Sequence, residues 1–217
     1  MASASLAVTA PLGPSWRTGL KVEGSPASDP EIAAHYNIVT PRYFRTMGIP
    51  LLAGREFDTS DRRNGRSVAI INEAFSRRLF PGENPIGKQL LIPGNESEIV
   101  AFEIIGIAKD TKYRRLTEDS QPYFYLCALQ QYQPSMVLYV RADGDRAALI
   151  GMFRQQIREL DARFASLDFR PVTERLDVSL RPQRRVAGLI SMFALVAFIL
   201  ASVERLLEAR GIEPGAN

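Results

Sequence analysis

The chain has 217 residues, of which 46% are hydrophobic and 24% are charged. This balance leaves room for one or two compact domains with apolar cores, and it argues against a chain that is disordered throughout. The net charge of +3 comes from cations and anions that are interleaved along the sequence. Because no basic stripe indicates a nucleic-acid interface, we expect no nucleic-acid partner.

A single cysteine and a single histidine restrict the chemistry of the chain. Cys127 is the only cysteine, which excludes an internal disulfide and a multi-cysteine metal cage. His35 is the only histidine, so a multi-histidine metal site is excluded and a Ser-His-Asp triad would need this imidazole. We interpret Cys127 as a buried strand residue and His35 as a structural residue at the start of a strand. No cofactor and no metal site are predicted.

The first third of the chain predicts short strands around one helical turn. Pro41 and Gly48 bracket residues 42–47 in the order typical of a helix start and a helix end. A polar loop follows and extends through Gly65. The strands predicted in this part are residues 1–10, 20–23, 36–39 and 49–52.

The middle of the chain predicts further strands and two helices. Asn72 can cap a helix that carries Glu73 in its first turn and ends before Pro81. Residues 145–160 have the apolar periodicity of an amphipathic helix. The predicted strands are residues 68–71, 89–92, 98–108, 123–128 and 136–140. The last two are continuous apolar runs, which favour central positions in a sheet.

The short motifs in the sequence predict no catalytic site. Gly82, Gly87 and Lys88 have the spacing of a phosphate-binding P-loop, but a predicted helix precedes them and an extended segment follows. Pro85 also removes one of the backbone N–H donors that such a loop uses. The carboxylates that lie outside predicted helices are expected to be solvated surface groups. The five considered as candidates for acid and base roles are Asp58, Asp61, Glu98, Glu118 and Asp119.

An uncharged run of eighteen residues, 186–203, stands near the C-terminal end of the sequence. At about 1.5 Å per residue it extends roughly 27 Å as a helix, close to the thickness of a bilayer core. We predict a transmembrane helix, preceded by a short helix over residues 173–180 and a bend at Pro182. The alternative is a buried core helix of a water-soluble domain.

Several long segments together resemble one known family. Residues 40–57, TPRYFRTMGIPLLAGREF, resemble a signature segment of MacB/FtsX-type ABC transporter permeases. Residues 68–88, VAIINEAFSRRLFPGENPIGK, resemble the next signature, and residues 104–110 resemble a strand that follows it. The order continues through the helix at 145–160 and the apolar run, so the resemblance extends to about Ser202.

The resemblance implies a fold and a division of the chain. It implies an α+β extracytoplasmic domain, rich in βαβ connections and with an inserted small subdomain, followed by one transmembrane helix. We expect residues 1–172 to be a partial MacB-like periplasmic core domain and residues 173–185 to be a juxtamembrane coupling segment. Residues 186–203 would then be the membrane helix and residues 204–217 a polar tail. Relative to the family, the sequence is expected to be truncated at both ends.

The resemblance also implies a role without catalysis in this chain. A cytoplasmic ABC ATPase would hydrolyse ATP, and the permease would couple that motion to export or mechanotransmission. The implied partners are membrane lipid, other permease helices or a second permease copy, and that ATPase; the segment around Gly87 and Lys88 would be a turn. Two alternatives stay open: a soluble nucleotide-binding enzyme that uses Lys88, and a single-span adhesion or sensor protein.

Overall fold

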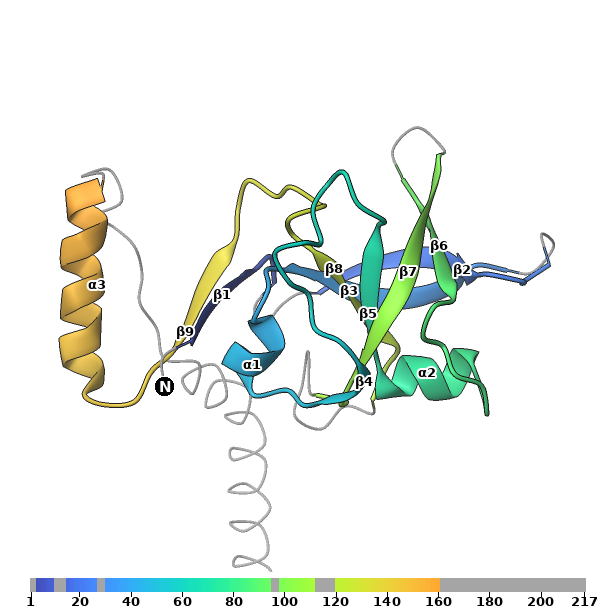
Figure 1. The fold of residues 1–217 in the computed structure, drawn as a ribbon, viewed down its shortest axis with the longest axis horizontal. Helices are drawn as coiled ribbons and strands as arrows, with labels where there is room; N and C mark the ends of the chain where they lie inside the picture. The colour runs from blue at the N-terminus through green and yellow to red at the C-terminus, as the bar shows by residue number, and fades with distance from the viewer. Residues whose placement is uncertain (1–2, 10–14, 27–29, 95–97, 112–119, 161–217) are drawn as a thin grey trace, which may run out of the picture. The chain divides into compact units, whose positions relative to one another are not determined.

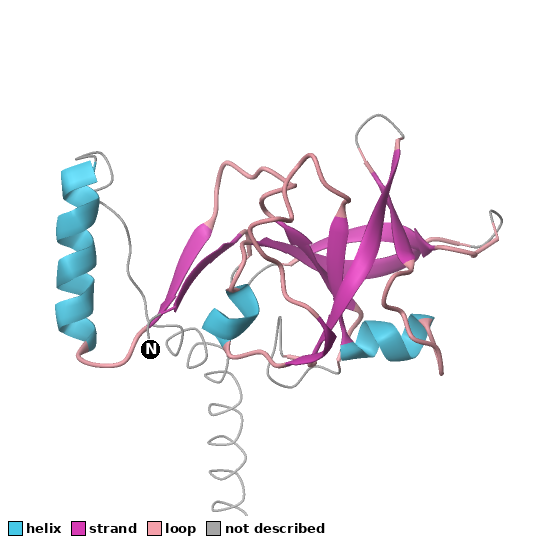
Figure 2. Cartoon of the chain, in the orientation of Figure 1, coloured by secondary structure: helices cyan, strands magenta, loops and turns pink. Residues whose placement is uncertain are grey.

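The computed structural model describes residues 3–9, 15–26, 30–94, 98–111 and 120–160 (Figures 1 and 2). The chain divides into two compact units, Met1–Arg170 and Pro171–Asn217, and every described residue belongs to the first. The predicted membrane helix, coupling segment and polar tail therefore lie outside the described residues, and the domain limits stay predictions. Among the described helices, none has the length and apolar character needed to span a bilayer.

Within the described residues the first unit contains nine strands and three helices, labelled in Figure 1. In chain order they are β1 (Ser3–Ala7), β2 (Trp16–Val22), β3 (Ile32–Val39), α1 (Tyr43–Met47), β4 (Leu51–Gly54), β5 (Val68–Asn72), α2 (Glu73–Leu79), β6 (Gln89–Pro93), β7 (Ile99–Ala108), β8 (Tyr123–Cys127), β9 (Val137–Arg141) and α3 (Arg146–Leu160). The predicted mixture of helices and strands is confirmed.

The strands form one sheet that closes on itself. Following hydrogen-bonded neighbours gives the order β2-β6-β7-β5-β8-β3, and β3 pairs again with β2, so six strands make a ring. Strands β1 and β9 extend the sheet from β3, and β4 pairs with β7. The β3–β8 and β5–β7 pairs are parallel. Helix α2 and strand β6 both lie on the connection between the parallel strands β5 and β7, so this connection contains the strand–helix–strand order that the resemblance implies. The inserted subdomain stays a prediction.

Two hydrophobic cores lie on opposite faces of the same strands. In β8, Tyr123, Tyr125 and Cys127 belong to one core, and Phe124 and Leu126 belong to the other. The core that contains Phe124 receives side chains from all six strands of the ring, so it is the interior of the ring. Every residue of β8 is buried, which confirms the central position predicted for residues 123–128.

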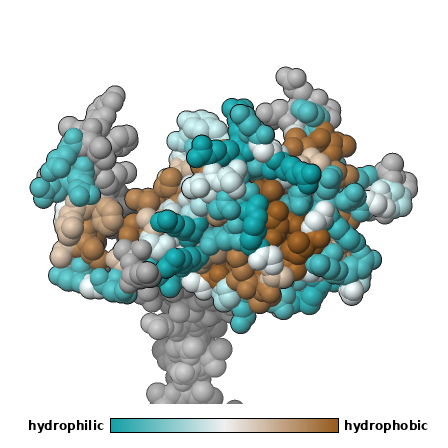
Figure 3. All heavy atoms as spheres, viewed as in Figure 1, coloured by the Kyte–Doolittle hydropathy of each residue, from teal (hydrophilic) through white to brown (hydrophobic). Residues whose placement is uncertain are grey.

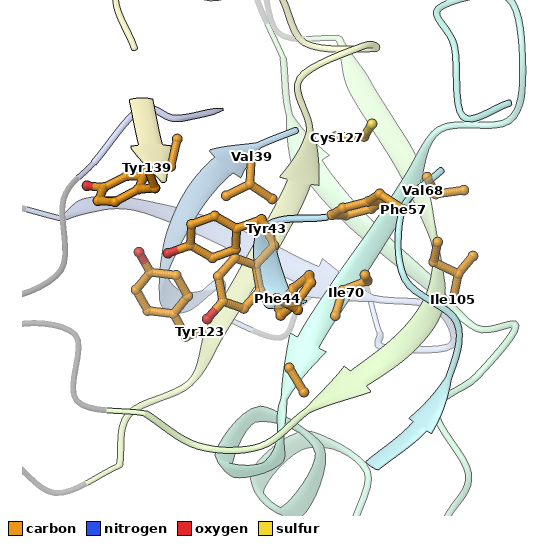
Figure 4. Close-up of a cluster of buried hydrophobic side chains, with 13 residues drawn as sticks. Val39, Tyr43, Phe44, Phe57, Val68, Ile70, Ile105, Tyr123, Cys127 and Tyr139 are labelled. Atoms are coloured by element: carbon orange, nitrogen blue, oxygen red, sulfur yellow. The ribbon is translucent and has the colours of Figure 1, made fainter. Parts of the chain in front are cut away.

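Helix α1 covers the outer face of the ring. Phe44 packs edge-on against Tyr125 with ring centroids 4.7 Å apart, and Tyr43 contacts both Phe44 and Tyr125. Figure 4 shows Tyr43 and Phe44 side by side in this core, with Phe57 near Phe44. The prediction of a helical turn before Gly48 is confirmed, because Gly48 ends α1 with φ 70°.

Two further helix predictions are confirmed. The Asn72 side chain accepts a hydrogen bond of 2.9 Å from the Phe75 backbone N–H and caps α2. Helix α3 begins at Arg146, where the Asp145 carboxylate accepts a bond of 2.9 Å from the backbone N–H of Ala147. Both caps satisfy N–H groups that have no partner inside their own helix.

Strand β9 corrects the prediction that residues 136–140 take a central position. In the described part of the sheet β9 pairs only with β1 and forms an edge. Val137, Leu138 and Val140 are 39%, 48% and 40% exposed, and only Tyr139 is buried. A continuous apolar run predicts a strand that is covered on both faces, but the number of neighbouring strands depends on pairing that the run does not encode.

The backbones of β4 and β7 approach each other closely at Gly54. Its φ is 75°, and a Cβ placed there would lie 2.1 Å from the carbonyl oxygen of Ile105. Gly82 has nearly the same φ of 76°, but a Cβ at that position would meet no atom within 4 Å beyond its chain neighbours. Substitutions at these two glycines therefore distinguish the energetic cost of a left-handed backbone, which both positions have, from the cost of a steric clash, which only Gly54 has.

We expect Gly54→Ala to destabilise the domain more than Gly82→Ala does. The left-handed backbone alone costs a residue with a Cβ about 1–2 kcal/mol, and Gly82→Ala should show this cost. Gly54→Ala should add the clash with Ile105 and lose about 3 kcal/mol or more. Denaturant unfolding of the full chain in detergent measures both. Equal losses in the two variants would contradict the close approach of β4 to β7.

Candidate functional site: the arginine loop between β4 and β5

The loop of residues 55–67, which we call the arginine loop, joins β4 to β5 and carries Arg55, Arg62, Arg63 and Arg66. In Figure 1 it lies beside the segment that follows β8. The buried side chain of Gln130 in that segment joins the two: its Nε2 donates to the carbonyl oxygens of Arg66 (2.7 Å) and Arg62 (3.4 Å). Its Oε1 accepts from the Val68 N–H at 3.0 Å. The second half of the loop is therefore held against the sheet.

A buried carboxylate organises the first half of the loop. Asp61 is only 6% exposed, and it accepts two parallel hydrogen bonds from the Arg55 guanidinium, Nη1 to Oδ2 at 2.8 Å and Nη2 to Oδ1 at 2.7 Å. The Asp58 backbone N–H donates a third at 2.9 Å. These bonds compensate for the water that the carboxylate loses. The pair also raises the pKa of Arg55, chiefly through the hydrogen bond to Asp61.

The prediction that Asp61 is a solvated surface group is therefore wrong. Its bidentate partner, Arg55, lies six residues earlier in the same irregular loop. In a helix or a strand the sequence separation predicts which side chains meet, but in such a loop it does not. Asp58 and Glu98 are exposed, as predicted, and Asp58 accepts from the Ser60 backbone N–H at 2.7 Å. Glu118 and Asp119 lie outside the described residues.

Cys127 lies beneath the arginine loop. Its thiol is fully buried in β8, as predicted, and its Sγ donates to the carbonyl oxygen of Asp61 at 3.5 Å. Burial raises the pKa of the thiol, so the group stays protonated and unreactive while the loop covers it.

A shallow pocket of about 420 Å³ opens on the loop surface. Its wall is formed by Thr59, Arg62, Arg63, Asn64 and Leu129. Arg62 Nε donates to the Thr59 carbonyl oxygen at 2.8 Å and so holds one guanidinium at the rim. The wall includes two cations and no carboxylate, which is the composition of a site for anionic groups.

A second polar cluster joins the carboxyl ends of the parallel strands β5 and β7. The Asp110 carboxylate accepts from Asn72 Nδ2, from the Ala74 N–H and from Arg77, each at 2.8 Å. The fully buried Asn72 also accepts from the Tyr123 N–H at 2.9 Å. Sequence analysis identified Asn72 as a helix cap but missed Asp110, which is 38 residues away in the chain. Since these polar groups bind one another, the cluster is structural.

The remaining predicted candidates have structural roles. His35 lies inside β3 rather than at its start. Its Nδ1 is 2.9 Å from Ser15 Oγ, and its ring stacks on Tyr123.

Lys88 also has a structural role. It forms an ion pair with Glu83, and its Nζ lies 5.2 Å from the Phe80 ring centroid. Residues 82–88 are a turn between helix α2 and strand β6, the reverse of the strand–loop–helix order of a P-loop. In the described part of the chain, no group of three or more His, Cys, Asp or Glu residues could hold a metal ion.

Comparison with known proteins assigns this mixed α/β domain to a family. Residues 7–160 match the sequence profile of the MacB-like periplasmic core domain. The match covers more than half of the chain, and the chain belongs to this family of ABC transporter permease domains.

Individual relatives agree with this assignment. "Probable syringafactin export ATP-binding/permease protein SyfD" of Pseudomonas syringae pv. tomato is 32% identical over 83 residues, which are 38% of this chain and 12% of that protein. "Macrolide export ATP-binding/permease protein MacB" of Syntrophobacter fumaroxidans is 35% identical over 68 residues, 31% of this chain and 9% of that protein. The chain thus matches only about a tenth of the length of these curated relatives.

The fold is similar to that of a solved structure. The periplasmic region of MacB from Actinobacillus actinomycetemcomitans superposes with a TM-score of 0.52 at 17% identity, and the match covers 73% of this chain and 66% of that one. At this identity the likeness concerns the fold alone. The prediction of a MacB/FtsX-type periplasmic domain is confirmed.

We expect Asp61→Asn to loosen the arginine loop and expose Cys127. Arg55 is about half exposed, so losing the ion pair should cost about 1–2 kcal/mol rather than the larger cost of a fully buried pair. A thiol reagent should then label Cys127 about 5–30-fold faster in native conditions. Glu98→Gln, which removes the charge of an exposed carboxylate outside the loop, is the matched control and should leave the labelling rate at that of the wild type. Equal rates in all three proteins would contradict the bracing role of Asp61.

Proposed function

We propose that this chain is the extracytoplasmic domain and membrane anchor of an ABC transporter permease. In this proposal it carries no catalytic site and couples motion driven by a cytoplasmic ATPase to export or mechanotransmission. The observation that carries the proposal is the family match over residues 7–160, which includes eight of the nine described strands in full. The relatives named as export ATP-binding/permease proteins supply the transport context.

The fold is suited to a mechanical role. A closed ring of strands with an apolar interior resists shear between neighbouring strands, because any sliding would break hydrogen bonds on both sides of a strand. Such a body moves as a unit when force is applied at one end. Residues 173–185 would transmit that force to the domain from the predicted membrane helix at 186–203.

The partners in this proposal follow from the predicted membrane helix and from the family. Membrane lipid would surround residues 186–203, and other permease helices or a second permease copy would pack beside them. The cytoplasmic ABC ATPase would act on the membrane part. The arrangement of Lys88 supports a structural turn rather than a nucleotide site, because its ammonium group is paired with Glu83 over the Phe80 ring.

We expect the expressed chain to stay with the membrane fraction and to expose its folded domain on the outer side. Trypsin added to spheroplasts should cleave the domain at exposed arginines while a cytoplasmic marker protein stays intact. Cleavage of the domain only after the bilayer is dissolved would contradict this placement.

Arginines introduced into the apolar run test whether residues 186–203 hold the chain in the membrane. Each arginine near the centre of a membrane helix costs about 2.5–3.5 kcal/mol, so Leu195→Arg with Phe198→Arg should release the chain into the soluble fraction. Leu206→Arg with Leu207→Arg, which places the same charges in the polar tail, is the matched control and should remain in the membrane fraction. Release of both variants, or of neither, would count against an anchor at 186–203.

A further inference from the structure

The wall of the arginine-loop pocket carries cations that the fold itself does not neutralise. Arg62 and Arg63 form no ion pair with any residue that the structure describes. The acids of the same loop are already engaged. Asp61 is buried against Arg55, Asp58 lies 3.5 Å from the same guanidinium, and Glu56 accepts from the Phe44 N–H at 3.1 Å. Arg66 has an 87% exposed side chain and reaches Glu103 only at 3.4 Å. The pocket therefore presents positive charge to solvent.

The loop that presents these cations is braced in one conformation. The carbonyl oxygens of Asp61, Arg62 and Arg66 accept from Cys127 or Gln130 of the neighbouring segment. Within the loop, the Arg62 N–H donates to Ser60 at 2.8 Å and the Gly65 N–H donates to Arg62 at 2.9 Å. A surface that is ordered before binding loses less conformational entropy when a ligand arrives.

We propose that this pocket binds a carboxylate-bearing segment of a partner protein. The guanidinium groups of Arg62 and Arg63 would each take a carboxylate through paired N–H donors, and the Asn64 amide would add a donor beside them. The inference does not depend on the transport role, since it rests on the geometry of the loop.

The apolar part of the surface favours a protein segment over a free inorganic phosphate. Leu129 lines the pocket and is 40% exposed, and Tyr132 on the same segment is 81% exposed. A peptide can cover such groups with its own side chains, whereas an inorganic anion uses only the cations. Arginine and tyrosine are also enriched in the energetically important parts of protein interfaces. Figure 3 shows mostly hydrophilic side chains over the part of the domain where Figure 1 draws this loop.

A binding experiment with the full chain in non-ionic detergent tests the proposal. The probe is a dye-labelled hexapeptide of glutamate and leucine in about 150 mM salt, where exposed charges are screened beyond about 8 Å. We expect the double variant R62E/R63E to bind it at least about tenfold more weakly than wild type, as the loss of two paired carboxylate contacts implies. R17E/R78E changes two exposed arginines elsewhere by the same charge and should bind with an affinity close to that of wild type. Unchanged labelling of Cys127 in R62E/R63E verifies that the loop is still folded.

Further arms of the experiment distinguish the source of the anionic group. R62K/R63K keeps the charge but removes the paired donors, and we expect a several-fold loss of affinity. A version of the peptide with glutamine in place of glutamate should not bind. The proposal would be overturned if wild type failed to bind the peptide, or if both charge-reversed variants lost affinity equally. Full affinity in R62K/R63K, or displacement of the peptide by inorganic phosphate at equal concentration, would also overturn it.

Discussion

Strand β2 hydrogen-bonds to β3 along one side and to β6 along the other, and this double pairing converts an open sheet into a ring. Trp16 to Leu20 align with β3, and Lys21 and Val22 align with β6. Without this closure β6 would be an edge, and the interior core would open to water. With it, β5 and β8 are buried on both faces, and burial of apolar surface on both faces is the largest favourable contribution to the stability of the fold.

The other parts of the domain attach to this ring. Helix α1 covers the outer face through Tyr43 and Phe44. The buried Asn72 and the partly buried Asp110 hold α2 to the carboxyl ends of the parallel strands. The arginine loop lies across the end of β8, where Asp61 and Gln130 fix its shape. A stiff frame that carries one braced, cationic loop supports the two proposals made above, that the domain moves as a body and that it binds a partner at this loop.

Local signals predicted much of this fold. The cap at Asn72, the helix end at Gly48 and the apolar run of β8 each depend on a few adjacent residues, and each appears where the sequence indicated. Features that depend on distant residues were missed. Ring closure requires β2 to meet β6, which lies far along the chain, and the apolar residues of β9 do not reveal that they form an edge. The pocket was also missed, because Leu129 joins Arg62 only in the folded chain.

Hydrogen exchange of the full chain in detergent tests the closed ring most directly. If β2 closes the ring, its backbone N–H groups that face β6 and those that face β3 should be protected to a similar degree, and they should open together with β5 and β8. The amides at the outer edge of β9 should exchange much faster. Rapid exchange along the β6-facing side of β2, with β5 and β8 still protected, would show an open sheet and would contradict the closed ring on which the rest of the structure depends.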